Sequence, residues 1–273
     1  MKLGLSSYAY RWSIGVGSSL PSSPMDVHQF VDRAIDLNVS GVQICDNLRY
    51  QNLSPVEIRE IRRKIETRGM FIETGARGSK PQYLRKMLNL SNQLGSKILR
   101  VVAEIDRKGG KEYVAKQIDT LVREIGEVLN LAEDLDIRLA LENHATLSSE
   151  EILAIVRSIG SGFLKVCLDT MNSVALMEHP LQTARALAPH AVTVHLKDFK
   201  IEKQPGYYRI VGVPLGEGLV DFPQIMRILK ESGLDPSVHI ELYVDRKENE
   251  RATRHWEEEC VAKSLRYARA NLL

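Results

Sequence analysis

Short apolar runs alternate along the chain with longer segments whose apolar residues recur at helical spacing. Runs of this length are typical of buried strands, and the longer pattern is typical of amphipathic helices. We interpret these runs as strands: 3–8, 41–45, 70–73, 98–103, 137–141, 164–168, 192–198 and 238–242. The helices predicted between and after them are 25–38, 54–68, 80–94, 111–135, 148–160, 181–187, 221–232 and 253–273. The segments 9–24 and 199–220 are expected to be long loops.

Strands that alternate with helices imply right-handed crossovers and a parallel sheet. Eight such units in 273 residues predict the α/β class and a closed (β/α)8 barrel, the TIM barrel, with residues 1–273 as a single domain. An open doubly wound sheet is the alternative. Two observations count against it: no glycine-rich phosphate motif follows the first strand, and polar residues recur at the carboxyl end of nearly every strand.

Composition and charge narrow the class of protein. The 37 basic and 35 acidic residues nearly cancel, and basic groups such as Arg62-Arg63-Lys64 have acids nearby, so we expect no nucleic-acid partner. The cysteines Cys45, Cys167 and Cys260 are odd in number and irregularly spaced, which favours a reducing compartment, with Cys45 and Cys167 as buried thiols. No signal-peptide core and no run of membrane-spanning length is present, so we expect a soluble cytoplasmic protein without a membrane partner.

The polar residues at the predicted strand ends hold the candidate chemistry. They are Tyr8, Gln43, Glu73, Glu104, Glu142, Asp169, His195 and Glu241. In a barrel these ends converge on the face where active sites lie. One acid at such a position is usually a helix cap or a surface salt bridge, but Glu142, Asp169, His195 and Glu241 lie on four successive strands. Three carboxylates and one imidazole would repel one another without a divalent cation, and this donor set suits Mn²⁺, Mg²⁺ or Co²⁺.

Several motifs carry a resemblance to a known family. They are Leu141-Glu142-Asn143-His144, Leu168-Asp169-Thr170-Met171-Asn172, Val194-His195-Leu196-Lys197-Asp198, Pro214-Leu215-Gly216-Glu217-Gly218 and Ile240-Glu241-Leu242. In order and spacing the chain resembles the sugar phosphate isomerase/epimerase family of the xylose-isomerase-like TIM barrel superfamily. The likeness covers nearly the whole chain. Relatives in the superfamily include epimerases, keto–aldose isomerases, inosose dehydratases, other keto-acid lyases and endonucleases that act on abasic DNA.

The resemblance implies a metal-dependent isomerase or epimerase of a sugar, keto-sugar or inosose. In the epimerase branch, the residues that match Glu142, Asp169, His195 and Glu241 bind the metal, which we expect to be Mn²⁺, with Mg²⁺ or Co²⁺ as alternatives. The matches of the two glutamates also move protons, so Glu142 and Glu241 would remove and return a proton on either side of an enediolate. The implied partner is a small carbohydrate, and homo-oligomers are common among relatives.

One departure from the epimerase pattern favours an alternative. Epimerases place an arginine shortly after the strand that carries the histidine, whereas residues 199–203 hold none here and the nearest is Arg209. Together with Lys197, which shares a strand face with His195, this leaves room for an acidic substrate. The alternative is therefore a lyase, a decarboxylase or dehydratase of an oxo sugar acid.

Two further readings fit the sequence less well. The endonuclease branch binds three zinc ions and needs histidines at the second and third strand ends, where this chain has Cys45-Asp46 and Glu73-Thr74. A barrel that binds a ligand without catalysis would be signalled by loss of a metal ligand, and all four ligand positions are filled.

The candidate substrate contacts are Lys197, His144, Tyr8, Trp12, Glu73 and Arg209. Lys197 could bind a carboxylate or an oxyanion, or pair with Asp198. His144 could orient the substrate or serve a loop. Tyr8 and Trp12 could form an apolar wall. Glu73 and Glu104 could bind hydroxyl groups, or pair with Arg77 or Arg100, and His239 is expected to be a buried, hydrogen-bonded histidine.

Overall fold

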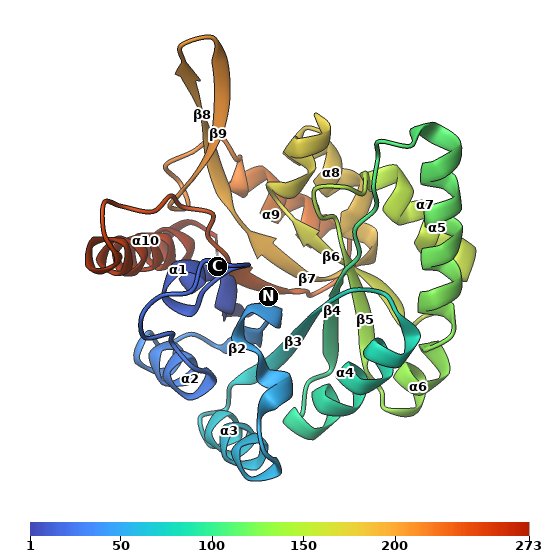
Figure 1. Cartoon of the computed structure of the whole chain (residues 1–273), viewed down its shortest axis with the longest axis horizontal. Helices are drawn as coiled ribbons and strands as arrows, with labels where there is room; N and C mark the ends of the chain where they lie inside the picture. The colour runs from blue at the N-terminus through green and yellow to red at the C-terminus, as the bar shows by residue number, and fades with distance from the viewer. Residues whose placement is uncertain (273) are drawn as a thin grey trace.

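Eight parallel strands close into a barrel that is ringed by helices (Figure 1). The computed structural model describes residues 1–272. The barrel strands are β1 (Leu3–Ser6), β2 (Gly41–Ile44), β3 (Phe71–Arg77), β4 (Ile98–Val102), β5 (Arg138–Glu142), β6 (Leu164–Asp169), β7 (Ala191–Leu196) and β10 (Ser237–Ile240). Their order around the barrel is β1-β10-β7-β6-β5-β4-β3-β2. The predicted (β/α)8 barrel is therefore confirmed, and β5, β6, β7 and β10 are consecutive neighbours in it.

Apart from two differences, the helices follow the predicted pattern. They are α1 (Arg11–Ile14), α2 (Val27–Asp36), α3 (Pro55–Thr67), α4 (Pro81–Leu94), α5 (Gly110–Gly126), α6 (Leu129–Asp134), α7 (Ser149–Ile159), α8 (Pro180–Leu187), α9 (Phe222–Glu231) and α10 (Glu250–Asn271). The short helix α1 lies in the segment 9–24, which was expected to be a loop, and the single helix expected over 111–135 is divided into α5 and α6. The first of them ends at Gly126, where a glycine weakens a helix interior.

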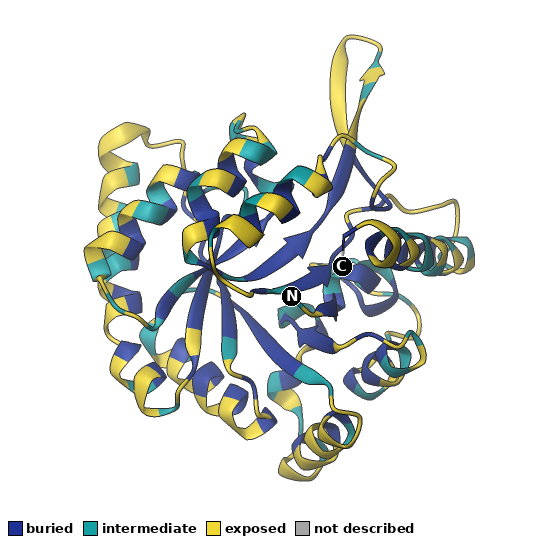
Figure 2. Cartoon of the chain, turned by 180° about the vertical axis from the view of Figure 1, so that it is seen from behind, coloured by how far each residue is buried: buried dark blue, intermediate teal, exposed yellow. Residues whose placement is uncertain are grey.

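The core lies inside the barrel and between the barrel and its helices. Figure 2 shows the barrel strands almost wholly buried and the helices buried on the faces that touch them. Cys45, Cys167 and Cys260 are free and buried, as expected for the first two. Within residues 1–272, none of the helices combines the length and apolar character that crossing a membrane requires.

The segment expected to be a loop over 199–220 instead contains a β-hairpin. Its strands β8 (Asp198–Gln204) and β9 (Tyr207–Val213) are antiparallel and project from the barrel (Figure 1). Gly206, in the turn, has a φ of +84°, which favours glycine. At the base of the hairpin, Gly212 forms a parallel bridge with Val244, in the segment after β10. The prediction of an unstructured loop was wrong because a turn at Pro205-Gly206 lets the two flanking segments pair.

Candidate active site

The four predicted metal ligands meet at the carboxyl ends of four neighbouring strands. Glu142 ends β5, Asp169 ends β6, His195 lies one residue before the end of β7, and Glu241 directly follows β10. Nδ1 of His195 lies 3.1 Å from Oε2 of Glu241 and 3.6 Å from Oε2 of Glu142 and from Oδ2 of Asp169. All four side chains are buried. The structure therefore brings this quartet together around one point.

Gln43 fixes the orientation of the His195 ring. The Gln43 amide nitrogen donates to Oε2 of Glu73 at 3.0 Å, so its oxygen Oε1 is free to accept a hydrogen bond. Nε2 of His195 lies 2.7 Å from that oxygen and acts as the donor. The lone pair of Nδ1 in the neutral imidazole then faces the three carboxylates, which is the orientation that a metal-binding histidine requires.

The donor set fits a divalent cation. Nδ1 of His195 is buried, accepts no hydrogen bond within residues 1–272, and faces carboxylate oxygens that cannot donate one. Potential ligand atoms of Asp169, His195 and Glu241 lie within 4.8 Å of one another. Cys167 lies beside the other ring nitrogen of His195, but burial raises the pKa of its thiol to about 12, so the thiol is a poor ligand. The set is thus oxygen-rich with one nitrogen.

Two buried cations contact the carboxylates of the quartet. Arg100, in β4, donates from Nε to Oε2 of Glu142. Nζ of Lys197 lies 2.6 Å from Oε1 of Glu241 and 2.8 Å from Oδ2 of Asp169. Three carboxylates thus face two cations, and a divalent cation would leave the cluster with one positive charge in excess. Such an excess suits an anionic substrate.

Lys197 does not pair with Asp198, which was one of its two expected roles. The Asp198 carboxylate instead accepts backbone N–H groups of Phe199, Gly216 and Gly218, each at 2.9 Å, and of Val220 at 3.1 Å. Asp198 therefore links the segment after β9 to the end of β7 by hydrogen bonds.

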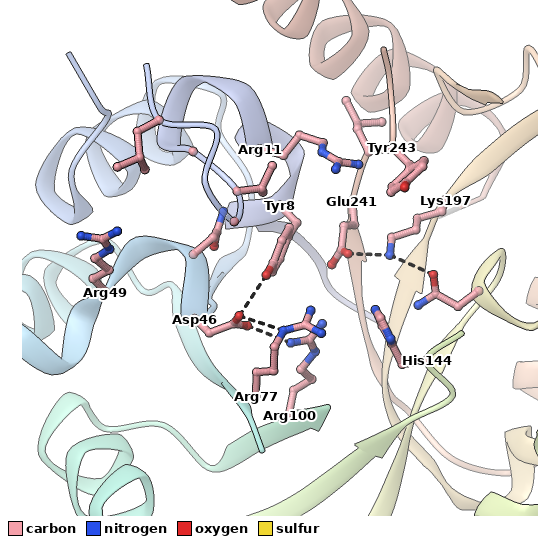
Figure 3. A pocket seen from close by; sticks show the side chains of 17 residues that line it. Tyr8, Arg11, Asp46, Arg49, Arg77, Arg100, His144, Lys197, Glu241 and Tyr243 are labelled. Atoms are coloured by element: carbon pink, nitrogen blue, oxygen red, sulfur yellow. Dashed lines mark hydrogen bonds and ion pairs between the residues drawn. The ribbon is translucent and has the colours of Figure 1, made fainter. Parts of the chain in front are cut away.

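A cavity of about 460 Å³ opens beside Glu241, which is the member of the quartet that lines it (Figure 3). Of the predicted substrate contacts, Tyr8, His144 and Lys197 line this cavity. The hydroxyl of Tyr8 donates to Oδ2 of Asp46 at 3.0 Å, and Nδ1 of His144 lies 3.0 Å from Oε1 of Glu104. The other polar residues that line it are Arg11, Asp46, Asn47, Arg49, Arg77, Arg100, Asn172, Glu241 and Tyr243.

Glu73 lies outside this cavity. Its carboxylate contacts Nε2 of His239 at 3.0 Å and accepts from Thr193 at 2.8 Å, both within the barrel. This confirms the expectation that His239 is a buried, hydrogen-bonded histidine. Glu104 takes the structural pairing that was expected, with Nη1 of Arg77 at 2.8 Å.

The structure does not bring Arg209 or Trp12 to the cavity wall either. Arg209 lies on the hairpin, where it pairs with Asp245 at 2.7 Å. The indole N–H of Trp12 donates to the carbonyl of Val244 at 2.7 Å, and the ring lies against the side chain of Arg11. Trp12 therefore supports a residue of the cavity instead of lining it.

Sequence reasoning did not assign site roles to Arg100, Asn172 or Arg11. Arg100 interrupts the apolar run of β4, and a charge inside a buried strand needs a partner, so a signal was present. Nδ2 of Asn172 donates to Oε1 of Glu142 at 2.8 Å. The position of Arg11 depends on contacts with distant parts of the chain and has no local signal.

The fold agrees with comparisons to known proteins. The chain matches the xylose isomerase-like TIM barrel family over residues 31–269, and it belongs to this family. The 3-oxo-isoapionate decarboxylase of Pectobacterium atrosepticum is 26% identical over 269 residues, which cover 98% of this chain and 94% of that protein. The L-ribulose-5-phosphate 3-epimerase UlaE of Salmonella paratyphi A is 24% identical over 195 residues, which cover 67% of this chain and 64% of that protein. These relatives are sugar-processing enzymes.

Solved structures show the same fold. A D-psicose 3-epimerase in the presence of D-fructose has a TM-score of 0.75 at 17% identity, covering 100% of this chain and 99% of that one. The IOLI protein with a binding zinc atom has a TM-score of 0.76 at 16% identity, with the same coverage. At these identities the likeness establishes the fold.

Proposed function

We propose that the protein is a divalent-metal-dependent lyase that decarboxylates a 3-oxo sugar acid. The observation that carries this proposal is that both carboxylate oxygens of Glu142 are engaged. Oε2 accepts from Arg100 and Oε1 accepts from Asn172. The decarboxylase relative from Pectobacterium atrosepticum, which aligns with nearly the whole chain, supports it as well.

The contacts of Glu142 matter because epimerisation and decarboxylation place different demands on it. Two-base epimerisation needs Glu142 and Glu241 each to take up or release a proton. A carboxylate held by a buried guanidinium and an amide N–H is stabilised as the anion. Decarboxylation needs no base at the start, so it is compatible with a glutamate that stays ionised as a ligand.

The proposed reaction breaks the bond between the carboxylate carbon and its neighbour. The electron pair of that bond forms a double bond to the carbon of the 3-oxo group, whose oxygen takes the negative charge, and CO₂ leaves. The resulting enolate takes up a proton from water at the carbon that carried the carboxylate. Glu142, Asp169, His195 and Glu241 would hold the cation, with Mn²⁺ as the first choice and Mg²⁺ or Co²⁺ as alternatives. When bound, this cation supplies Lewis-acid polarisation of a carbonyl group and offsets negative charge on its oxygen.

The residues of the chain contribute position and charge. Lys197 and Arg100 hold the ligand carboxylates ionised and in place. His144 and Tyr8, which line the cavity, would orient hydroxyl groups of the substrate. The walls of the cavity would hold the substrate beside Glu241.

An isomerase or epimerase of a sugar, keto-sugar or inosose is the second candidate. Glu142 and Glu241 approach Nδ1 of His195 from different strands, so they could flank a bound keto-sugar and exchange its protons through an enediolate. The epimerase relative UlaE supports this reading.

The two candidates predict different products in D₂O. Protein loaded with Mn²⁺ is incubated with freshly generated 3-oxo sugar acids and, separately, with neutral keto-sugars, and Glu241→Gln is the inactive control. We expect CO₂ from the acids and no solvent deuterium in the recovered keto-sugars. Inverted, deuterated keto-sugars without CO₂ from any acid would establish the second candidate and refute the first.

A further inference from the structure

Arg11 is held over the active-site cavity by two aromatic rings. Its guanidinium carbon lies 4.2 Å from the ring centroid of Tyr243 and 4.7 Å from that of Trp12. Figure 3 shows the side chain reaching toward the part of the cavity that holds Glu241 and Tyr243. Aromatic faces attract a guanidinium without neutralising its charge, so this clamp fixes a cation that can still bind an anion.

Arg11 has no acidic partner, unlike three other cations that line the cavity. Its Nε is buried without a hydrogen-bond partner, and the side chain forms no ion pair within residues 1–272. Arg77, Arg100 and Lys197 are all paired with carboxylates. The carboxylate of Glu257, in α10, accepts instead from the backbone N–H of Trp12 at 2.6 Å and from Ser13.

Lys197 is poorly placed to bind a further anion. An ammonium group has three N–H donors. Nζ of Lys197 lies 2.6 Å from Glu241 and 2.8 Å from Asp169, and it donates to Oδ1 of Asn172 at 3.5 Å. Its donors are therefore already directed at protein oxygens.

The hairpin keeps the clamp in position. Gly212, in β9, bridges to Val244, and a Cβ atom at residue 212 would lie 2.3 Å from the carbonyl oxygen of Tyr243. The backbone approach that places Tyr243 thus requires a glycine at this position. Trp12 is tied to the same segment through the Val244 carbonyl. The guanidinium of Arg11 is accordingly pre-positioned before a ligand arrives, which lowers the entropic cost of binding.

We propose that Arg11 binds the carboxylate of the substrate and selects sugar acids over neutral sugars. This inference rests on the proposed function for the identity of the substrate, and it assigns to Arg11 the carboxylate contact first considered for Lys197. The guanidinium offers a planar set of donors that matches a carboxylate in two-pronged geometry. Arg11 is thus a specificity residue at the rim, separate from the quartet.

Binding of a matched acid and polyol tests this role without turnover. Calorimetry measures the affinities of Mn²⁺-loaded wild-type protein, Arg11→Met, Arg11→Lys and Arg49→Met for L-threonate and L-threitol. We expect Arg11→Met to weaken threonate binding by about 10- to 100-fold and to leave threitol binding unchanged. Arg11→Lys should retain part of the preference for the acid. Arg49 is the matched control, because it lines the same cavity without an acidic partner in residues 1–272 but is exposed and has no aromatic clamp.

Three outcomes would overturn the inference. They are equal losses for threonate and threitol in Arg11→Met, an equal effect of Arg49→Met, and a wild-type protein that does not prefer threonate. Thermal melting and metal content confirm that each variant is folded and loaded, and Arg11→Lys provides the comparison if Arg11→Met does not fold. A protein that prefers threonate through Arg11 but releases no CO₂ from oxo acids would refute the proposed function alone. A decarboxylase whose Arg11→Met variant keeps the preference would refute this inference alone.

Discussion

The guanidinium of Arg100 donates to the carboxylate of Glu142 inside the barrel, where both side chains are almost completely shielded, at 1% and 0% exposure. Burial raises the pKa of Glu142, but Arg100, His195 and Lys197 together lower it more, with Arg100 as the largest of these, and the pKa lies well below the usual range. Each group therefore depends on the other to remain charged away from water.

Replacing Arg100 by methionine should strongly destabilise the protein in the absence of added metal. The change leaves the carboxylate of Glu142 buried without its partner, for which we expect a loss of about 3–5 kcal/mol in the free energy of unfolding. Urea denaturation measures this loss. Arg77→Met is the matched control, because Arg77 pairs with Asp46 and Glu104 but is 36% exposed, so its loss should stay below about 1 kcal/mol. Equal losses in the two variants would show that burial of the Arg100–Glu142 pair does not increase its contribution to the free energy of unfolding.

Gln43→Leu should weaken metal binding without removing a ligand. The substitution deletes the acceptor that orients His195, and the loss of such supporting contacts commonly lowers metal affinity by about 10- to 100-fold. Competition with a fluorescent chelator measures the dissociation constant for Mn²⁺. Cys45→Ala is the control, since the Cys45 thiol donates to the same Gln43 oxygen at 3.2 Å and has no direct contact with His195. A Gln43→Leu variant with wild-type affinity would disprove the orienting role.

Local sequence signals predicted the barrel and most of its helix starts. The capping boxes Ser54–Glu57 and Ser148–Glu151 lie where the structure begins α3 and α7, because a cap is completed by residues three positions apart. The hairpin was missed because only Phe199 and Ile201 suggest alternation in β8, among charged neighbours. The Pro205-Gly206 turn was the signal that could have revealed it.

The quartet was predictable because parallel strands bring their carboxyl ends to one face. Asp169 and His195 are partners in the register of β6 and β7, as the order of the motifs suggested. The cations that surround the quartet were not predictable in the same way. Arg100 meets Glu142 on the neighbouring strand β5, which depends on the register of the two strands, and Arg11 is positioned by Tyr243 from the far end of the chain, which depends on the closed fold.

The ionised carboxylate of Glu73 should stabilise the folded protein, and this stabilisation should be lost at acidic pH. Burial raises the pKa of this carboxyl, but the charge and hydrogen bond of His239 and the hydrogen bonds from Ser237 and Gln43 lower it more, so the pKa lies below its usual value. The folded protein then binds a proton at Glu73 less readily than the unfolded chain, whose value is about 4.3. The stabilisation is present above that pH and is lost as the pH falls through the lower pKa of the folded state.

We expect the difference in the free energy of unfolding between wild type and Glu73→Gln, measured in urea from pH 7 down to pH 3, to narrow in this acidic range. Glu231→Gln, at the exposed end of α9, should show no such narrowing. A gap for Glu73→Gln that stays constant down to pH 3 would mean that the carboxylate charge contributes nothing to folding.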